Sequence, residues 1–137
     1  MSRENVVRSV VGRLSLRAPQ AVSLECLHNA LESVPALRDP NARSAEELAE
    51  MTASLATKFP ALSDFEREFP SLCFALATGV GKTRLMGAFI SYLHLGYGIN
   101  NFFVLAPNLT IYNKLIADFT PNTPKYVFKG IGEFAQQ

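Results

Sequence analysis

The sequence has few features of a secreted, metal-stabilised or membrane protein. Its only two cysteines, Cys26 and Cys73, stand far apart in apolar contexts, without a histidine or cysteine at ligand spacing. This arrangement argues against a disulfide framework and a structural metal site, and it favours a reducing cytoplasm. No apolar run approaches the roughly 20 residues that span a bilayer, and the first residues lack the apolar core of a secretory signal. We therefore expect a cytoplasmic protein without a membrane segment.

The chain also lacks a strong charge of either sign. Its 13 lysines and arginines nearly balance 12 aspartates and glutamates, for a formal net charge of +1. This balance argues against a highly basic nucleic-acid-binding arm and against a disordered acidic tail. Four arginines near the start are opposed only by Glu4: Arg3, Arg8, Arg13 and Arg17. An organelle-targeting helix would have this pattern, but we expect a solvated basic lead-in.

The first half of the chain has helical periodicity. At 137 residues the chain is long enough for one domain with a single core. Apolar residues recur at helical spacing over 19–34, and a second helix is predicted to start at Ser44 and to end before Pro60. Ser44 and Glu47 together resemble a capping box. We expect residues 1–70 to form a helical amino-terminal region.

The apolar pattern changes after Pro70. Two continuous apolar runs, "LCFALA" (72–77) and "FFVLA" (102–106), are typical of strands that are covered on both faces in a parallel sheet. Between them, apolar residues at 85–93 recur on one face of a helix. The order strand, helix, strand predicts a right-handed crossover with parallel strands.

Two further elements are predicted beyond this crossover. A short helix is expected at 109–118, and "KYVFK" (125–129) is a possible third strand. We therefore predict an α/β domain over residues 71–137, with parallel strands and flanking helices.

The segment "TGVGKT" (78–83) lies between the predicted strand and the predicted helix. At this place, unpaired backbone N–H groups of a first helical turn converge and attract anions. Gly79 and Gly81 allow the loop to wrap a phosphate closely and to take positive φ. Lys82 can then place its ammonium between the β and γ phosphates, and the Thr83 hydroxyl can ligate a Mg²⁺ ion.

The alternative is an ordinary glycine-rich turn whose Lys82 faces solvent. The general phosphate-loop pattern also asks for a glycine five positions before Gly81, where this chain has Leu76. The position between strand and helix nevertheless favours a nucleotide site.

These segments resemble motifs of superfamily 2 helicases of the DEAD/DEAH type. "LATGVGKT" is similar to their first motif, and "FFVLAPNLTIYNKL" (102–115) is similar to the next one. The stretch "NLTIYNKLIADFTPNTPKYVFKGIGEF" is particularly like the helicase subunit of type III restriction enzymes. "LRAPQ" (16–20) resembles the glutamine motif that precedes the phosphate loop. The resemblance implies a partial RecA-like domain at 71–137, in the amino-terminal part of a DNA helicase or translocase.

The resemblance also implies roles for individual residues. Lys82 and Thr83 would be catalytic, with Thr83 as the Mg²⁺ ligand. Gln20 would pair with the adenine amino group and a ring nitrogen through its carboxamide, which favours ATP; alternatively, it is an exposed first-turn residue. The residues that would bind ATP are Gln20, Thr78, Gly79, Val80, Gly81, Lys82, Thr83 and Arg84.

The second motif would contact nucleic acid. Pro107, Asn108 and Thr110 would lie at the carboxyl end of a strand and bind the DNA backbone. Asn108 or Thr110 alternatively caps the following helix. In the full-length protein, the resemblance implies DNA as a partner, together with the remaining helicase lobe or a modification subunit.

Hydrolysis in these enzymes requires a strand that ends in an acidic pair. After Lys82 the only acidic residues are Asp118 and Glu133, and neither follows an apolar strand. We therefore expect this chain by itself to bind ATP and to hydrolyse little. A small P-loop kinase and a non-catalytic module that binds a nucleotide or a partner remain as alternatives.

Overall fold

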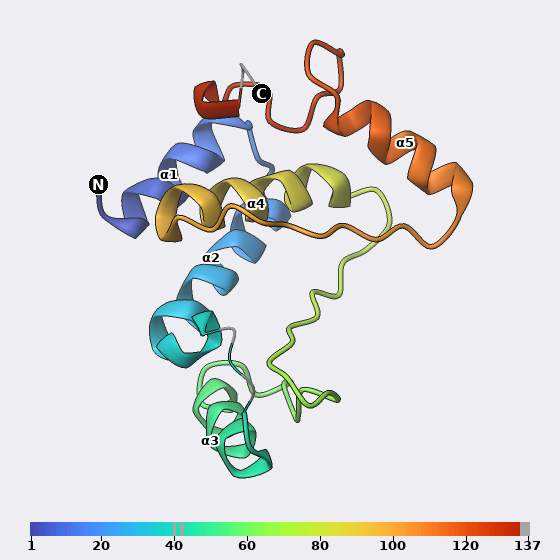
Figure 1. The fold of residues 1–137 in the computed structure, drawn as a ribbon. Helices are drawn as coiled ribbons and strands as arrows, with labels where there is room; N and C mark the ends of the chain where they lie inside the picture. Colours follow the sequence, from blue (N-terminus) through green and yellow to red (C-terminus); the bar gives the residue numbers. More distant parts are fainter. Residues whose placement is uncertain (40, 42, 135–137) are drawn as a thin grey trace. The chain divides into compact units, whose positions relative to one another are not determined.

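The computed structural model describes residues 1–39, 41 and 43–134. The chain divides into two compact units, one formed by Met1–Glu25 with the segment from Leu76 onward, and the other by Cys26–Ala75. Every regular element of the described residues is helical (Figure 1): α1 (Arg3–Arg13), α2 (Ala18–Ser33), η1 (Pro35–Arg38), α3 (Ala45–Ala56), α4 (Lys82–Tyr97), α5 (Leu109–Phe119) and η2 (Gly132–Phe134).

The predicted α/β fold is wrong for the described residues, which contain no strand. Residues 72–77 and 102–106 lack regular structure and form no ladder of backbone hydrogen bonds. A strand exists only beside a neighbour that accepts and donates such bonds. The second segment also leaves apolar side chains in solvent, with Phe103 88% and Leu105 76% exposed. Both runs are hydrophobic, but no segment among the described residues pairs with them.

The predicted third strand at 125–129 is also wrong. Its backbone forms turns, because Tyr126 N–H donates to Thr123 O at 3.2 Å and Lys129 N–H donates to Tyr126 O at 3.2 Å. Val127 and Phe128 are both buried, whereas adjacent residues of a strand point to opposite faces. The Tyr126 hydroxyl donates to Phe134 O at 3.1 Å, and burial raises the pKa of this tyrosine.

The helices predicted from periodicity are confirmed. α2 and α3 form where 19–34 and the segment after Ser44 predicted them, and α5 closely matches 109–118. The Ser44 side chain accepts a hydrogen bond from Glu47 N–H at 3.2 Å, which is the capping contact that the sequence predicted. Within the described residues, no helix combines the length and the apolar character needed to cross a bilayer.

The basic side chains of the arginine-rich start are exposed, as predicted for a solvated lead-in, but most of this segment is a helix that packs on one face. α1 buries Val6, Val7 and Val10, and it contacts α4 (Figure 1). Arg3 donates from Nε to Gly96 O at 3.2 Å, and its guanidinium lies 4.4 Å from the centroid of the Tyr97 ring. Val6, Val7 and Val10 recur at helical spacing on one face, and the arginines of α1 remain exposed, which is why a basic helix can bury one side.

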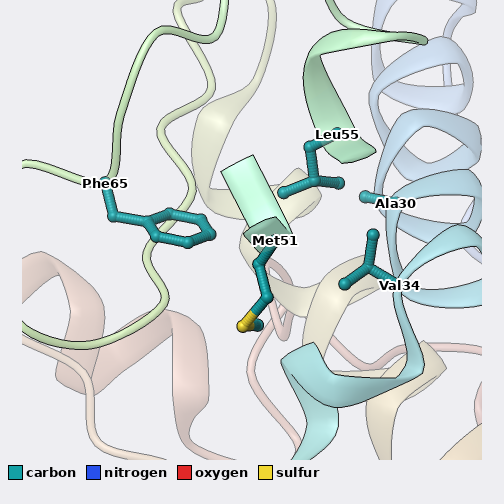
Figure 2. Close-up of a cluster of buried hydrophobic side chains, with 5 residues drawn as sticks. All are labelled: Ala30, Val34, Met51, Leu55 and Phe65. Atoms are coloured by element: carbon teal, nitrogen blue, oxygen red, sulfur yellow. The ribbon is translucent and has the colours of Figure 1, made fainter. Parts of the chain in front are cut away.

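The second unit has its own apolar core (Figure 2). Met51 and Leu55 of α3 face Ala30 and Val34 at the end of α2, and Phe65 closes the cluster. Leu55 has no solvent exposure, and the other four side chains are at least 93% buried. Burial of these side chains is the main source of stability for this unit.

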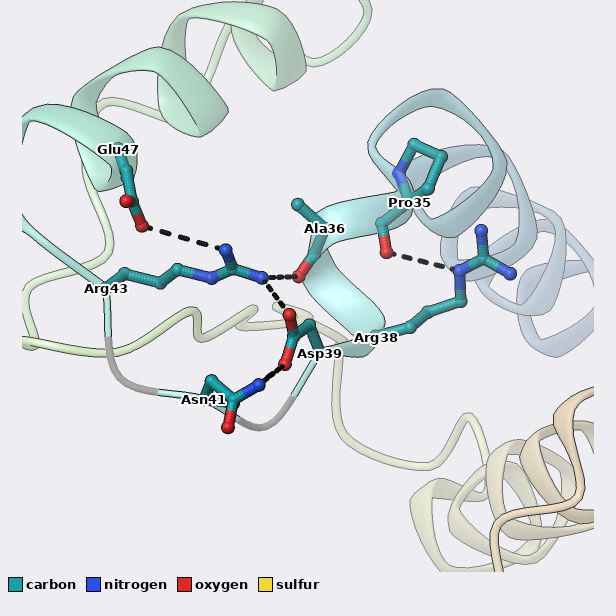
Figure 3. Close-up of polar contacts among 7 residues, drawn as sticks. All are labelled: Pro35, Ala36, Arg38, Asp39, Asn41, Arg43 and Glu47. Carbon is teal, nitrogen blue, oxygen red and sulfur yellow. Dashed lines mark hydrogen bonds and ion pairs between the residues drawn. The ribbon is translucent and has the colours of Figure 1, made fainter.

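A polar network connects η1 to the start of α3 (Figure 3). Arg43 donates to Asp39 at 2.8 Å and to the Ala36 carbonyl at 3.3 Å, and it lies 3.7 Å from Glu47. The backbone N–H of Asn41 donates to Asp39 Oδ1 at 2.9 Å. This bond, assisted by Arg43, holds the pKa of Asp39 below its ordinary value.

Candidate functional site

The candidate site is the loop that enters α4. Gly79 has a φ of +85° and Gly81 a φ of +84°. Val80 lies between them and does not have a positive φ. Backbone in which φ alternates in sign can turn successive N–H groups toward one side, which is the conformation of an anion-binding nest. The glycines that the sequence predicted for close wrapping are therefore in the required conformation.

The first turn of α4 has no side-chain cap. Its N-cap is Gly81, whereas α1, α3 and α5 are each capped by a side-chain oxygen of Ser2, Ser44 or Asn108. The first backbone bond of α4 is from Leu85 N–H to Gly81 O at 3.1 Å. The preceding N–H groups have no intrahelical acceptor, so they remain available to an external anion.

Lys82 and Thr83 are the first two residues of α4. Lys82 is exposed and Thr83 is partly buried. An ammonium and a hydroxyl in the first turn of a helix lie beside the anion that the helix N-terminus attracts. The sequence-predicted pair thus follows directly on the nest.

Gln20 lies against this loop, in the same unit. Its side chain is 1% exposed, Nε2 donates to Gly81 O at 2.9 Å, and Oε1 accepts from Arg17 N–H at 2.8 Å. The alternative of an exposed first-turn residue is therefore wrong. Both ends of the carboxamide are bonded to backbone groups of the protein, so this conformation holds the loop, and adenine contact by Gln20 stays a prediction.

Two arginines reinforce the same junction. Arg17 donates from Nη2 to Gly79 O at 2.9 Å, and Arg84 donates from Nη1 to Leu14 O at 2.8 Å. Sequence reasoning assigned Arg17 to the lead-in and missed this contact. The available signal was its position in "LRAPQ", three residues before Gln20, where its backbone N–H can reach the glutamine side chain.

Substitution of Gln20 tests its role. With the amide bonded as described, we expect Gln20→Ala to weaken ATP and GTP binding equally, by about fivefold, because the loop loses one hydrogen bond that shapes it. Competition titrations with a fluorescent nucleotide measure both affinities. Val22→Ala, at a 56% exposed position of α2, is the control. A loss confined to ATP would instead indicate that Gln20 reads the adenine.

The residues predicted to bind nucleic acid lie at the start of α5. Pro107, Asn108 and Thr110 are all exposed. Asn108 Oδ1 accepts from Ile111 N–H at 2.9 Å, so the predicted capping role of Asn108 is confirmed. The link from α5 to the phosphate loop is through Lys114, whose Nζ lies 3.5 Å from Thr83 Oγ1.

The residues present fit a nucleoside triphosphate with Mg²⁺. The glycine nest and the uncapped helix fit phosphate oxygens. Among the described residues, no group of three or more His, Cys, Asp or Glu side chains could hold a metal ion. A Mg²⁺ ion here would depend on Thr83, the phosphates and water, which is a common coordination for this ion.

Two surface hollows are lined by residues outside the loop. One is lined by α3 and residues 63–68, and the other by residues around 121–132. Neither contains a residue of the loop. We identify the candidate site by its backbone geometry and its charged groups, because these are the features that bind phosphate.

Comparison with known families supports the same region. A family model described as "Type III restriction enzyme, res subunit" matches residues 13–137. No curated protein and no solved structure matches the chain significantly. The matched range includes Gln20, the loop that enters α4, and α5.

Proposed function

Because the chain belongs to the helicase-like family of type III restriction enzyme res subunits, we propose that its phosphate loop binds ATP with Mg²⁺. In the full-length protein, this binding would be coupled to movement on DNA. The remaining helicase lobe and a modification subunit would be further partners.

One observation carries the proposal. Two glycines at positive φ lead into an uncapped helix whose first residues are Lys82 and Thr83. A turn that only faces solvent does not require a nest followed directly by an uncapped helix. A bound phosphate, by contrast, accepts hydrogen bonds from the backbone N–H groups of both. The sequence motif and the backbone conformation support the proposal independently.

Each residue of the loop has a separate task in this proposal. Backbone N–H groups of the nest hold phosphate oxygens, and Lys82 neutralises charge between the terminal phosphates. The Thr83 hydroxyl oxygen ligates Mg²⁺, which when bound screens and orients the triphosphate. Gln20 Nε2 and Arg17 Nη2 donate hydrogen bonds to the Gly81 and Gly79 carbonyl oxygens, and these two bonds hold the backbone of the loop in place.

Hydrolysis requires a carboxylate that orients the attacking water. Of the two acidic residues after Lys82, Glu133 pairs with Arg13 at 3.0 Å and Asp118 pairs with Lys114 at 2.7 Å. Both carboxylates are thus engaged by basic side chains. We propose that this stretch binds ATP and hydrolyses it slowly.

The start of α5 is the proposed DNA contact. Pro107, Asn108 and Thr110 are exposed at a helix N-terminus, where backbone N–H groups can bind a phosphate of the DNA backbone. Such a contact would position the strand without reading its sequence.

Removal of the Lys82 ammonium tests the nucleotide site. We expect Lys82→Ala to weaken the binding of fluorescent ATP with Mg²⁺ by at least about tenfold, since a charge-assisted hydrogen bond is lost. Lys58→Ala, at an exposed lysine outside the loop, should leave the affinity unchanged. Equal affinities of the wild type and Lys82→Ala for ATP would show that the loop is not a nucleotide site.

A further inference from the structure

A second lysine lies beside the phosphate loop, from a different helix. Lys114 belongs to α5, 31 residues from Thr83, and its Nζ lies 3.5 Å from Thr83 Oγ1. Thr83 stands in the first turn of α4, where the proposed site would hold the terminal phosphates. The ammonium of Lys114 is therefore at the edge of that site.

Asp118 holds this ammonium in place. Its Oδ2 accepts from Lys114 Nζ at 2.7 Å, one helical turn along α5. Asp118 is 5% exposed, and it is the only buried residue among those that the structure describes in α5. A buried carboxylate is strongly disfavoured without a partner, so the pair fixes the direction of the lysine side chain.

Asp118 is itself attached to α4 through the turn that follows α5. Its backbone oxygen accepts from Val127 N–H at 2.9 Å. Val127 lies against Gly87 of α4, where a Cβ on the glycine would approach the Val127 Cβ to 3.0 Å. The close approach of this turn to α4 places Lys114 next to Thr83.

The ammonium retains capacity for an anion. It has three N–H donors, of which Asp118 takes one and Thr83 is within reach of a second. The Lys114 side chain is 55% exposed, so the third donor can reach an incoming ligand. A positive and a negative unit charge a few ångströms apart attract each other even in a partly solvated site.

We propose that Lys114 is a second cationic ligand of the terminal phosphates, presented from α5 and held by Asp118. The inference rests on the proposed nucleotide site and extends it to a residue outside the loop. Because α5 also carries the proposed DNA contact at its start, a nucleotide held by Lys114 would directly contact the helix that faces DNA.

Binding of inorganic tripolyphosphate, ATP and AMP to matched variants tests this role. Lys114→Gln should weaken tripolyphosphate and ATP binding by about fivefold and AMP binding by less than about twofold, because AMP lacks the terminal phosphates. Lys114→Arg should retain binding within about twofold. The control is Lys125→Gln, an exposed lysine of the same unit, which should bind as the wild type does.

A structural effect of the unpaired Asp118 is tested separately. The double variant Lys114→Gln, Asp118→Asn contains a neutral pair, and it should show the same loss of tripolyphosphate binding as Lys114→Gln. Recovery of binding in the double variant, or an equal loss in Lys125→Gln, would overturn the role of Lys114.

The two proposals fail in different ways. If Lys82→Ala loses binding and Lys114→Gln binds as the wild type does, the role of Lys114 is wrong and the nucleotide site stands. If the wild type binds neither tripolyphosphate nor ATP, both proposals are wrong.

Discussion

Gly130→Ala is expected to lower the free energy of unfolding by about 3 kcal/mol, from positive-φ strain and steric overlap together. Gly130 has a φ of +99°, and a Cβ at this position would overlap the backbone oxygen of Arg13. Backbone cannot move aside as a flexible side chain can, so the turn at Gly130 would separate from the end of α1. Urea unfolding monitored by circular dichroism measures the change.

Gly98→Ala is the matched control. Gly98 ends α4 with a φ of +69°, and no atom lies within 4 Å of its hypothetical Cβ. This variant carries the conformational strain without the overlap, so we expect a loss of about 1 kcal/mol. Equal losses in the two variants would show that the approach of Gly130 to Arg13 is not a close one.

Leu55→Ala is expected to destabilise the second unit by about 3 kcal/mol. Leu55 has no solvent exposure and lies within the cluster of Ala30, Val34, Met51 and Phe65. Truncation removes buried apolar area and leaves a cavity that helical neighbours fill poorly. Hydrogen exchange of the α3 amides, together with urea unfolding, measures the effect.

Phe69→Ala is the control for this core, because Phe69 is 59% exposed although its side chain is larger. We expect a change within about 0.5 kcal/mol. A comparable loss in both variants would contradict the assignment of the core to the side chains around Leu55.

The positions of the helices could be predicted because their signals are local. Ser44 and Asn108 bond backbone N–H groups only three residues away, and Gly98 ends α4 by taking positive φ itself. Such contacts form between residues close together in the sequence, so the residue types at those positions are enough to predict them. The strands could not be predicted in the same way, because a strand needs a partner segment.

The candidate site was predicted in part. The proposed roles of the glycines and of Lys82 come from the motif, because these residues are adjacent in sequence and their spacing can be recognised without the rest of the chain. The contacts of Arg17 with Gly79 and of Lys114 with Thr83 join residues 62 and 31 positions apart. No spacing rule indicates such pairs, because only the packing of the elements brings them together.

The sequence by itself determined the family and the helical segments, and it indicated the loop that we propose as the phosphate site, since each depends on residues close together in the chain. The tertiary structure decided that the apolar runs remain unpaired among the described residues and that α1 packs on α4. It also decided that Gln20 bonds the loop at Gly81. These outcomes depend on which surfaces meet, and burial and hydrogen bonding between distant segments are set by the fold as a whole.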